Sequence, residues 1–433
     1  MPDGIAANHG TRYGIGIHGG AQMAISVPYF TIKTKSDPGE LIFRRRPMAN
    51  SQARLAGRYT LEPDIDLEAF SCRAVIDWIV ICFWLGRKTQ IQWLKRDVDS
   101  ALGTNCHVDI HDEEPGGVSD KFDVTIQEPD LRKIRALCDA LEAKYGSEIL
   151  PAVRAIEISV DFKPKDPDDA ARAKLYTALT RHFWTDRDVI SRPYDRPRFT
   201  WGTKAEAAAE KKKKHDQVLM HLPKEEPCVN EHFLISTEHD RAPFVDANYY
   251  VGAKNADVRW RIMDKVVDQQ NRDAGTFVPL DDADKRVRVE VTLDRPAVER
   301  LGVTFLEDLP NLHFARLQKS FFTFMLPTFH GTGKAGRPLG AAINIWHDQH
   351  RIRKFLKIGV IGLKAMDDAR ERLAKKLRRQ EQGRMVANGL KMQRPSRVGT
   401  QKAGTFRAYE ELNGRVSDAL GELERRVGAA FSK

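Results

Sequence analysis

The order of segments between residues 74 and 162 constrains the fold of this chain most strongly. Residues 74–85 are rich in Ile, Val, Trp and Phe, which is typical of a strand, and residues 155–162 alternate strictly between apolar and polar side chains. Between them the pattern predicts a helix, two short strands and a second helix, in that order. These four segments cover residues 88–102, 106–111, 122–127 and 129–145. The order β-α-β-β-α-β is that of the split-βαβ, ferredoxin-like fold, so we expect an α+β protein.

The rest of the chain is expected to add three regions to this first half, which we place at residues 71–190. Residues 1–70 are rich in Gly, Pro and polar residues and indicate an N-terminal arm with at most a short hairpin around residues 29–33. Residues 191–303 are expected to form a related β-rich half, and residues 304–433 a helical basic region. The expected strands of the second half cover residues 233–236, 248–251, 258–264 and 287–293, and an Ala/Glu/Lys-rich helix covers 205–215. The helices expected at the C-terminal end cover residues 311–325, 342–357, 363–381 and 408–427.

The net charge of +10 is concentrated near the C-terminal end. Residues 351–433 hold 21 Lys or Arg and 9 Asp or Glu, a net charge of +12, so the other residues sum to −2. A concentrated positive field attracts phosphate backbones and makes binding sensitive to salt. We therefore expect DNA as the partner and Arg353 and Lys357 among its contacts. A basic helix that is simply solvated is the alternative reading.

Composition indicates a protein of the cytoplasm. The longest apolar run, residues 74–85, is interrupted by Asp77 and is shorter than the roughly 20 residues of a membrane helix, and the first residues lack the pattern of a signal peptide, so no membrane partner is expected. The 5 cysteines form no C-x-x-C pair and are odd in number, which favours a reducing compartment. They are Cys72, Cys82, Cys106, Cys138 and Cys228.

Carboxylates occur in three of the expected strands. Asp77 would share a strand face with Ile79 and Ile81, because alternate residues of a strand point to the same side. In the closing strand Glu157 and Asp161 line one face. If the fold is as expected, these two strands are neighbours in the sheet, and Asp77 lies beside Glu157 or Asp161.

The strand at residues 286–293 repeats this pattern, with Arg288 and Glu290 on one face and valines on the other. Clustered carboxylates are hard oxygen ligands for Mg²⁺ or Mn²⁺, and such a cation can polarise a scissile phosphate. Asp77, Glu157, Asp161 and Glu290 are therefore candidate metal ligands. The alternative is the solvated face of an antiparallel sheet, which alternates in the same way.

Residues 248–271 read NYYVGAKNADVRWRIMDKVVDQQN, and residues 286–293 read RVRVEVTL. This stretch resembles the replication initiation factors of plasmids and filamentous phages that act by rolling-circle replication. Their motif runs from an aromatic residue and a glycine through a strand ending Arg-Ile-Tyr-Asp-Lys to an Arg-x-Glu strand. The resemblance, taken from about residue 74 to 300, implies a DNA endonuclease that nicks and recloses an origin, with Arg261, Lys265 and Arg288 as phosphate contacts.

In that family a tyrosine attacks a DNA phosphate and stays linked to the 5′ end. The matching position here is Met263, whose thioether cannot act as this nucleophile. Three alternatives follow: nicking is lost and DNA binding is kept, Tyr249 or Tyr250 substitutes, or the resemblance is only structural. The two tyrosines also fit an ordinary role as aromatic strand residues.

Two further motifs are weaker. His107, Asp109 and His111 would share a strand face, but an exposed polar edge strand explains them as well as a metal site does. The glycine-rich residues 331–340 lack the spacing of a nucleotide phosphate-binding loop.

The preferred function is recognition of an origin or similar DNA site, with metal-dependent nicking if the catalytic site is intact. The rivals are a non-catalytic DNA-binding or regulatory protein on the same scaffold, and an interaction protein with a basic tail. A homodimer is left open.

Overall fold

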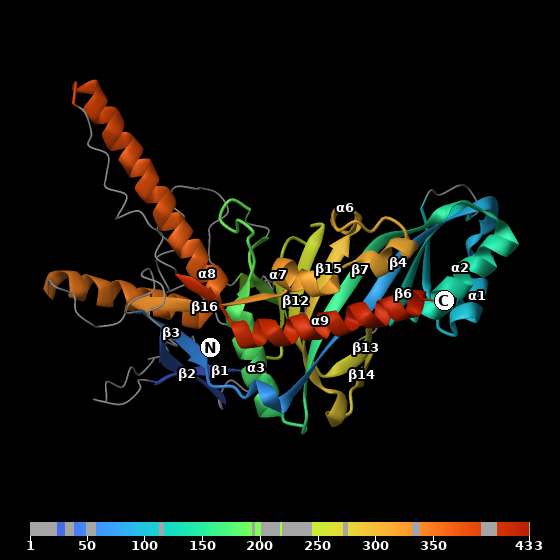
Figure 1. Ribbon diagram of the computed structural model, residues 1–433, viewed down its shortest axis with the longest axis horizontal. Coiled ribbons are helices and arrows are strands. Elements are labelled where there is room, and N and C mark those ends of the chain that lie inside the picture. The colour runs from blue at the N-terminus through green and yellow to red at the C-terminus, as the bar shows by residue number, and fades with distance from the viewer. Residues whose placement is uncertain are drawn as a thin grey trace, which may run out of the picture.

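The computed structural model describes residues 24–30, 39–48, 58–111, 117–192, 195–200, 217–218, 245–271, 276–330, 338–390 and 405–432. Helices and antiparallel sheets are mixed within these residues, which confirms the expected α+β class (Figure 1). The helix expected at residues 205–215 and the strand expected at 233–236 lie outside the described residues, as do residues 331–337 of the glycine-rich segment.

The six elements of the first half occur in the order that the sequence predicts. They are β4 (Phe70–Gln90), α1 (Ile91–Leu102), β5 (His107–Ile110), β6 (Val118–Gln127), α2 (Leu131–Tyr145) and β7 (Ser147–Pro164). Helix α2 begins where the Asp130 carboxylate accepts hydrogen bonds from the amides of Arg132 and Lys133. The four strands lie in the antiparallel order β7-β4-β6-β5, in which the last strand inserts beside the first as in the ferredoxin-like fold.

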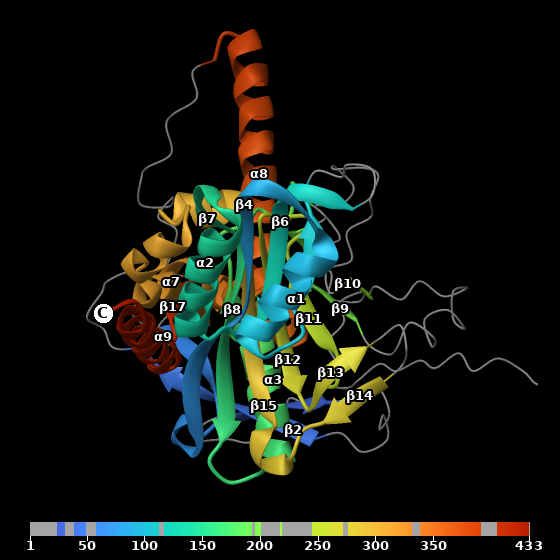
Figure 2. The same ribbon diagram turned by 90° about the vertical axis from the view of Figure 1, so that its right-hand side faces the viewer.

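The second half continues the same sheet from β7 outward. Five more strands follow in space: β15 (Arg286–Asp294), β12 (Val258–Lys265), β11 (Asn248–Val251), β9 (Arg198–Thr200) and β10 (Gln217–Val218). The described strands thus form one nine-stranded antiparallel sheet, whose strong twist is visible in Figure 2. β7 and β15 are central in this sheet, and each has a neighbour on both sides.

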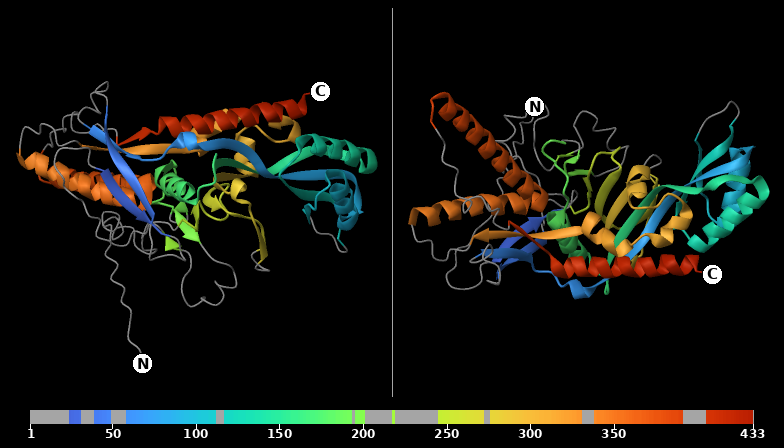
Figure 3. Two further views of the ribbon diagram at one scale, coloured as in Figure 1. Left: turned by 90° about the horizontal axis from the view of Figure 1, so that it is seen from below. Right: turned by 45° about the horizontal axis from the view of Figure 1, so that its top comes forward.

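One face of the sheet is apolar and covered by helices. The inward residues of β15 and β7 are fully buried and belong to one hydrophobic core with leucines and valines of α9 (Glu410–Phe431). Helices α1 and α2 cover the outer strands of the first half, and α3 (Asp169–His182) packs near β12. Both views of Figure 3 show α9 running lengthwise along the body. The helix expected at residues 408–427 is therefore a packing element and not part of a free basic tail.

A second sheet joins the two ends of the chain. Its described strands are β1 (Ala24–Tyr29), β2 (Gly39–Pro47), β3 (Arg58–Pro63), β16 (Thr323–His330), β17 (Phe406–Ala408) and β8 (Phe183–Trp184). The expectation of an N-terminal arm is wrong for these residues, because Tyr59 pairs with Phe329 and the apolar side chains of β2 and β3 pack on α8. The helix expected at residues 311–325 is also shorter: α7 (Phe314–Phe321) ends before β16 begins.

Helix α8 (Pro338–Ala387) is broken at Gly359, where φ is 73°. Its first half packs on the second sheet through Phe355 and Leu356. Its second half projects away from the body, as Figures 1 and 3 show. Every residue from 374 to 384 is exposed, and we call residues 374–387 the basic arm. The arm holds 5 Lys or Arg and 1 Glu.

The remaining elements are short. They are β13 (Val267–Asn271), β14 (Thr276–Pro279), α6 (Arg295–Arg300) and the 3₁₀ turns η2 (Leu67–Ala69), η4 (Asp282–Asp284) and η5 (Leu306–Asn311). None of the helices in the described ranges combines the length and the apolar composition that crossing a bilayer requires.

Candidate functional site

Charged side chains line the second face of the sheet in register across β12, β15 and β7. Arg261 lies opposite Glu290, which lies opposite Ser159. In the next row Met263 lies opposite Arg288, and Arg288 opposite Asp161. Residues that pair in this way project to the same face and touch. The strands therefore bring charged groups that are more than a hundred residues apart in the sequence into contact.

Asp77 joins this face at a β-bulge in β4. Ile76 pairs with Ile158 and Trp78 pairs with Glu157, so Asp77 is an extra residue between two paired ones. Before the bulge Arg73 and Val75 pair with Asp161 and Ser159, so alternation brings Asp77 to the same polar face, and the bulge turns Ile79 to the apolar core. The expected shared face with Ile79 and Ile81 is wrong for this reason, but the expected position beside Glu157 is found.

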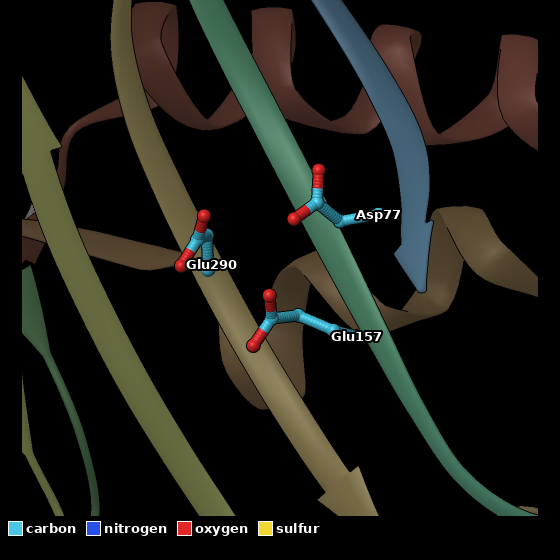
Figure 4. A group of neighbouring side chains, drawn as sticks. All are labelled: Asp77, Glu157 and Glu290. Carbon is cyan, nitrogen blue, oxygen red and sulfur yellow. The ribbon is translucent and has the colours of Figure 1, made fainter. Parts of the chain in front are cut away.

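Three of the four candidate metal ligands converge. One carboxylate oxygen from each of Asp77, Glu157 and Glu290 lies within 4.8 Å of the others. Figure 4 shows the three carboxylates in front of the strands, with α9 passing behind. Asp161 does not belong to this group; both of its oxygens accept hydrogen bonds from Arg288, at 2.5 and 2.7 Å.

Two arginines balance part of this negative charge. The Arg261 guanidinium donates from Nε to Glu290, and Arg288 donates from Nη1 to Asp77. Burial by itself lowers the pKa of each guanidinium, but the adjacent carboxylates outweigh burial and raise both pKa values above the ordinary range. Two of the predicted phosphate contacts, Arg261 and Arg288, are thus already paired with carboxylates at the site.

Glu157 is the carboxylate that is least compensated. It accepts a hydrogen bond of 2.5 Å from the Thr292 hydroxyl. Burial, followed by the nearby charge of Glu290, raises its pKa to about 7. A carboxyl with this pKa exchanges its proton near neutral pH, and a divalent cation would take the place of that proton.

Among the buried polar atoms of this face that have no hydrogen-bond partner in the described residues, two are oxygens of paired residues on β15 and β7. They are Oε1 of Glu290 and Oγ of Ser159, whose residues are 1% and 0% exposed. Arg288 Nη1 approaches Oε1 of Glu290 only to 3.7 Å. Such orphaned acceptors are rare in folded proteins and call for a partner such as an ion or water. Both atoms belong to the row of Arg261, Glu290 and Ser159, which contributes Glu290 to the carboxylate cluster.

The two candidate tyrosines lie on opposite faces. Tyr249 pairs with Ile262, is 1% exposed in the hydrophobic core, and has no described hydrogen-bond partner for its hydroxyl. Burial raises its pKa well above the ordinary value. Tyr250 pairs with Arg261 and is half-buried, with the Arg198 guanidinium 5.4 Å from the centre of its ring. Only Tyr250 shares the face of the carboxylates.

Met263 and Lys265 alternate with Arg261 along β12 and share its face, as the sequence predicts. Met263 is half-buried opposite Arg288. Lys265 forms an ion pair of 3.2 Å with Asp268. The other two predicted DNA contacts, Arg353 and Lys357, lie on α8 beside the second sheet and not at the carboxylate cluster.

The histidine motif lies at the edge of the sheet, on β5. His107 forms an ion-pair contact of 3.0 Å with Asp109, and both side chains are largely exposed. His111 contacts Asp123 instead, at 3.5 Å. This arrangement agrees with an exposed polar edge strand, the alternative to a metal site at these residues.

Sequence reasoning missed a pocket beside the cluster. The pocket has a volume of about 690 Å³ and is lined by residues of β4, β7, β15 and α9. Arg73 and Arg426 contribute two guanidinium groups to its lining. Alternation along β4 could have indicated that Arg73 is on the polar face, but no local signal places α9 there.

Comparisons with known proteins add no relative. Neither the models of known protein families nor the curated proteins include a match to this chain.

Proposed function

We propose that this protein binds DNA and that Asp77, Glu157 and Glu290 hold a divalent cation against a phosphodiester of the bound strand. The observation that carries the proposal is the convergence of the three carboxylate oxygens within 4.8 Å. The unpartnered Oε1 of Glu290 supports it, since a cation would satisfy that atom. The motif at residues 248–293 supports the finer proposal of a protein that initiates rolling-circle replication.

Mg²⁺ or Mn²⁺ fits the donor set, because both prefer carboxylate oxygens and keep positions open for water or phosphate. Bound there, the cation would polarise the phosphate and neutralise charge that develops on it. Arg261 and Arg288 lie next to the carboxylates and would hold them in place. They also supply positive charge beside the phosphate.

Tyr250 is the hydroxyl that this face offers for nicking. It lies on β11, two strands from Glu290, which corresponds to about 10 Å between strand axes. In the proposed step the Tyr250 oxygen bonds to phosphorus and the bond from phosphorus to the 3′ oxygen breaks. The phenol proton leaves to solvent, and the 3′ oxygen takes up a proton to become a 3′ hydroxyl. The strand end then remains linked to Tyr250 through its 5′ phosphate.

The basic arm supports the DNA-binding part of the proposal. Its residues 374–384 are all exposed and it projects from the body (Figure 3), so its cations are accessible to a DNA backbone. A positive helix of this kind contacts phosphates whatever the base sequence. This feature by itself also fits the rival of a non-catalytic DNA-binding protein, so cleavage has to be tested directly.

The test is cleavage of circular single-stranded DNA by the full-length protein with Mn²⁺. We expect slow linearisation that chelation abolishes, and a DNA adduct that survives denaturation. Glu290→Gln should remove cleavage, and Tyr250→Phe should remove the adduct, whereas the buried Tyr249→Phe should keep both. Cleavage that survives Tyr250→Phe without an adduct would assign the attack to water. DNA binding without any cleavage would favour the non-catalytic rival.

Met263→Tyr provides a separate control for the family motif. The new hydroxyl would share the face of Arg261 and Lys265. If the motif is aligned correctly, this variant should form adducts in the Tyr250→Phe background. If it does not, the likeness at residue 263 carries no catalytic meaning.

A further inference from the structure

The pocket beside the carboxylate cluster arises because β4 is longer than its neighbour. β6 pairs with β4 only from Trp78 onward, so the described part of β4 before that residue has β7 on one side and a free edge on the other. α9 crosses this edge, and Arg426 donates a hydrogen bond to the carbonyl of Ala74. The pocket opens between this edge, α9 and the start of α2. Asp77 and Arg288 line it, so it adjoins the cluster directly.

Most acidic groups of the pocket are already paired. Asp77 and Asp161 accept hydrogen bonds from Arg288. Asp284 accepts one of 2.9 Å from Lys163, and Asp130 caps the first turn of α2. With Glu128 the lining holds five acidic groups against Lys163, Arg286 and Arg288, and Arg73 and Arg426 bring its formal charge to zero.

Arg73 and Arg426 form no described ion pair with a carboxylate. Within the described ranges the Arg73 side chain has no ion pair or hydrogen bond. Nη2 of Arg426 donates to the Ala74 carbonyl, but its Nε is buried without a hydrogen-bond partner. Burial, and then the positive charge of Arg73, lowers the pKa of the Arg426 guanidinium. Two guanidinium groups that repel each other across a pocket are stabilised by an anion placed between them.

The geometry points to a phosphate subsite formed by Arg73 and Arg426, which binds a phosphate of the DNA strand next to the one at the cation. This inference rests on the proposed function for the identity of the strand. A guanidinium matches the oxygens of a phosphate with two parallel N–H donors, which makes arginine suited to this role. The subsite would fix the path of the strand across β4, so that the scissile phosphate is presented to Asp77, Glu157 and Glu290.

Arg73→Gln is the sharpest variant, because the wild-type side chain makes no described bond that the change would break. Binding of a fluorescent single-stranded oligonucleotide would be measured with the full-length protein, with Ca²⁺ as the cation, over a range of salt concentrations. We expect Arg73→Gln to weaken binding about tenfold. The slope of log affinity against log salt should fall by about 0.7, the value for one phosphate of a single strand.

Arg425→Gln is the matched control. Arg425 is the exposed neighbour of Arg426 on α9 and does not line the pocket, so its removal should leave affinity and slope unchanged. Arg73→Lys should retain the salt slope and lose part of the affinity. Arg426→Gln also removes the bond to Ala74, so its melting temperature must be measured together with its affinity.

The outcomes separate the subsite from the proposed function. If the wild type binds the oligonucleotide and Arg73→Gln binds it equally well with the same slope, the subsite is wrong and the proposed function stands. If the wild type binds no DNA, the proposed function and the DNA assignment fail together. In that case the melting temperature is measured with and without inorganic phosphate. An increase that Arg73→Gln loses would mean a site for free phosphate, and no increase in the wild type would rule out the subsite.

Discussion

Asp77 shows how a sequence argument can assign one residue to the wrong strand face although it places its neighbours correctly. Alternation correctly places Glu157 and Glu290 on the polar faces of their strands, and fold order correctly makes β4 the neighbour of β7. The bulge that separates Asp77 from the face of Ile79 has no signal in the sequence, because it is defined by the pairing of two strands and not by either one.

Glu157 should limit the stability of the cation-free protein. Its pKa of about 7 lies above the ordinary value of 4.5, so the folded state holds a proton that the unfolded state has lost between these pH values. Stability therefore falls as pH rises from 4.5 through 7. Glu157→Gln should raise the free energy of unfolding at pH 8 by about 1–3 kcal/mol. It should also remove stabilisation by Mn²⁺.

Urea denaturation at pH 5 and pH 8, with and without Mn²⁺, measures both effects of this substitution. Glu142→Gln is the control, since Glu142 is an exposed carboxylate on α2. A Glu157→Gln variant that is less stable than wild type at pH 8 would show that the charged form of Glu157 is a favourable part of the ion-pair network.

His182 should have the opposite effect to Glu157 and lower the stability of the protein in acid. Its ring is buried among Phe43, Phe355 and Tyr409, its Nδ1 lies 2.8 Å from the Met325 carbonyl, and burial lowers its pKa from 6.5 to about 4. The unfolded state takes up a proton first, so stability is lost as pH falls from 6.5 to 4. The loss at pH 5 should be about 2 kcal/mol.

His182→Gln keeps a donor for Met325 but cannot titrate. Its unfolding free energy should therefore fall less than that of the wild type between pH 7 and pH 5, as measured by urea denaturation. Parallel pH curves for the two proteins would show that the buried ring does not contribute.

At the scale of elements, Gly359 decides the direction of α8. Its φ of 73° is unfavourable for other residues, and a Cβ atom there would lie 2.5 Å from the carbonyl oxygen of Arg181. Gly359→Ala should destabilise the protein by more than about 1 kcal/mol, because both strain and a backbone clash must be relieved. The change would be measured as a drop in the midpoint of thermal unfolding.

Gly383→Ala is the matched control in the same helix. Nothing lies within 4 Å of a Cβ atom at Gly383, and that residue is exposed in the basic arm. This substitution should increase the helix content seen by circular dichroism without lowering the midpoint. Equal losses in the two variants would contradict the role assigned to the bend at Gly359.

The basic arm should carry much of the salt dependence of DNA binding. Deleting residues 351–433 cannot test this, because it removes α9 and the buried residues Arg351 and Lys354 of α8. Replacing the arm cations by Gln leaves those elements intact; the five are Lys375, Lys376, Arg378, Arg379 and Arg384. The slope of log affinity against log salt on duplex DNA should fall by about one unit for each phosphate that the arm no longer neutralises. An unchanged slope would place the DNA elsewhere on the molecule.

The sequence predicts elements with strong local periodicity and misses those made by distant pairing. The six elements of the first half were predicted with boundaries a few residues from those observed, apart from the longer strands β4 and β7, and β11 agrees fully at residues 248–251. β3 and β16 were missed; they pair with each other across more than 250 residues, and no local pattern indicates that pairing. The break of α8 at Gly359 lies between the two helices expected at 342–357 and 363–381.

At the scale of the whole molecule, the two sheets are not consecutive along the chain. Strands from the beginning and the end of the described chain meet in one sheet, and strands from its middle form the larger one. β1, β2 and β3 form one sheet with β16, β17 and the short β8, while most strands between β3 and β16 build the nine-stranded sheet and β13 and β14 form a separate pair (Figure 1). Strands from the two ends of the described chain thus lie side by side in one sheet. The candidate site depends on the central strands alone, which is why the sequence could identify most of its residues without predicting the second sheet.

The central claim is that the face of β4, β7 and β15 holds a divalent cation, and anomalous diffraction from crystals soaked in Mn²⁺ tests it most directly. The account predicts one strong anomalous peak between Asp77, Glu157 and Glu290 at pH 8, which is absent in Glu290→Gln crystals grown in the same way. A wild-type map without that peak, with Arg288 still bonded to Asp77 and Arg261 to Glu290, would contradict it and leave the cluster as an ion-pair network of the sheet.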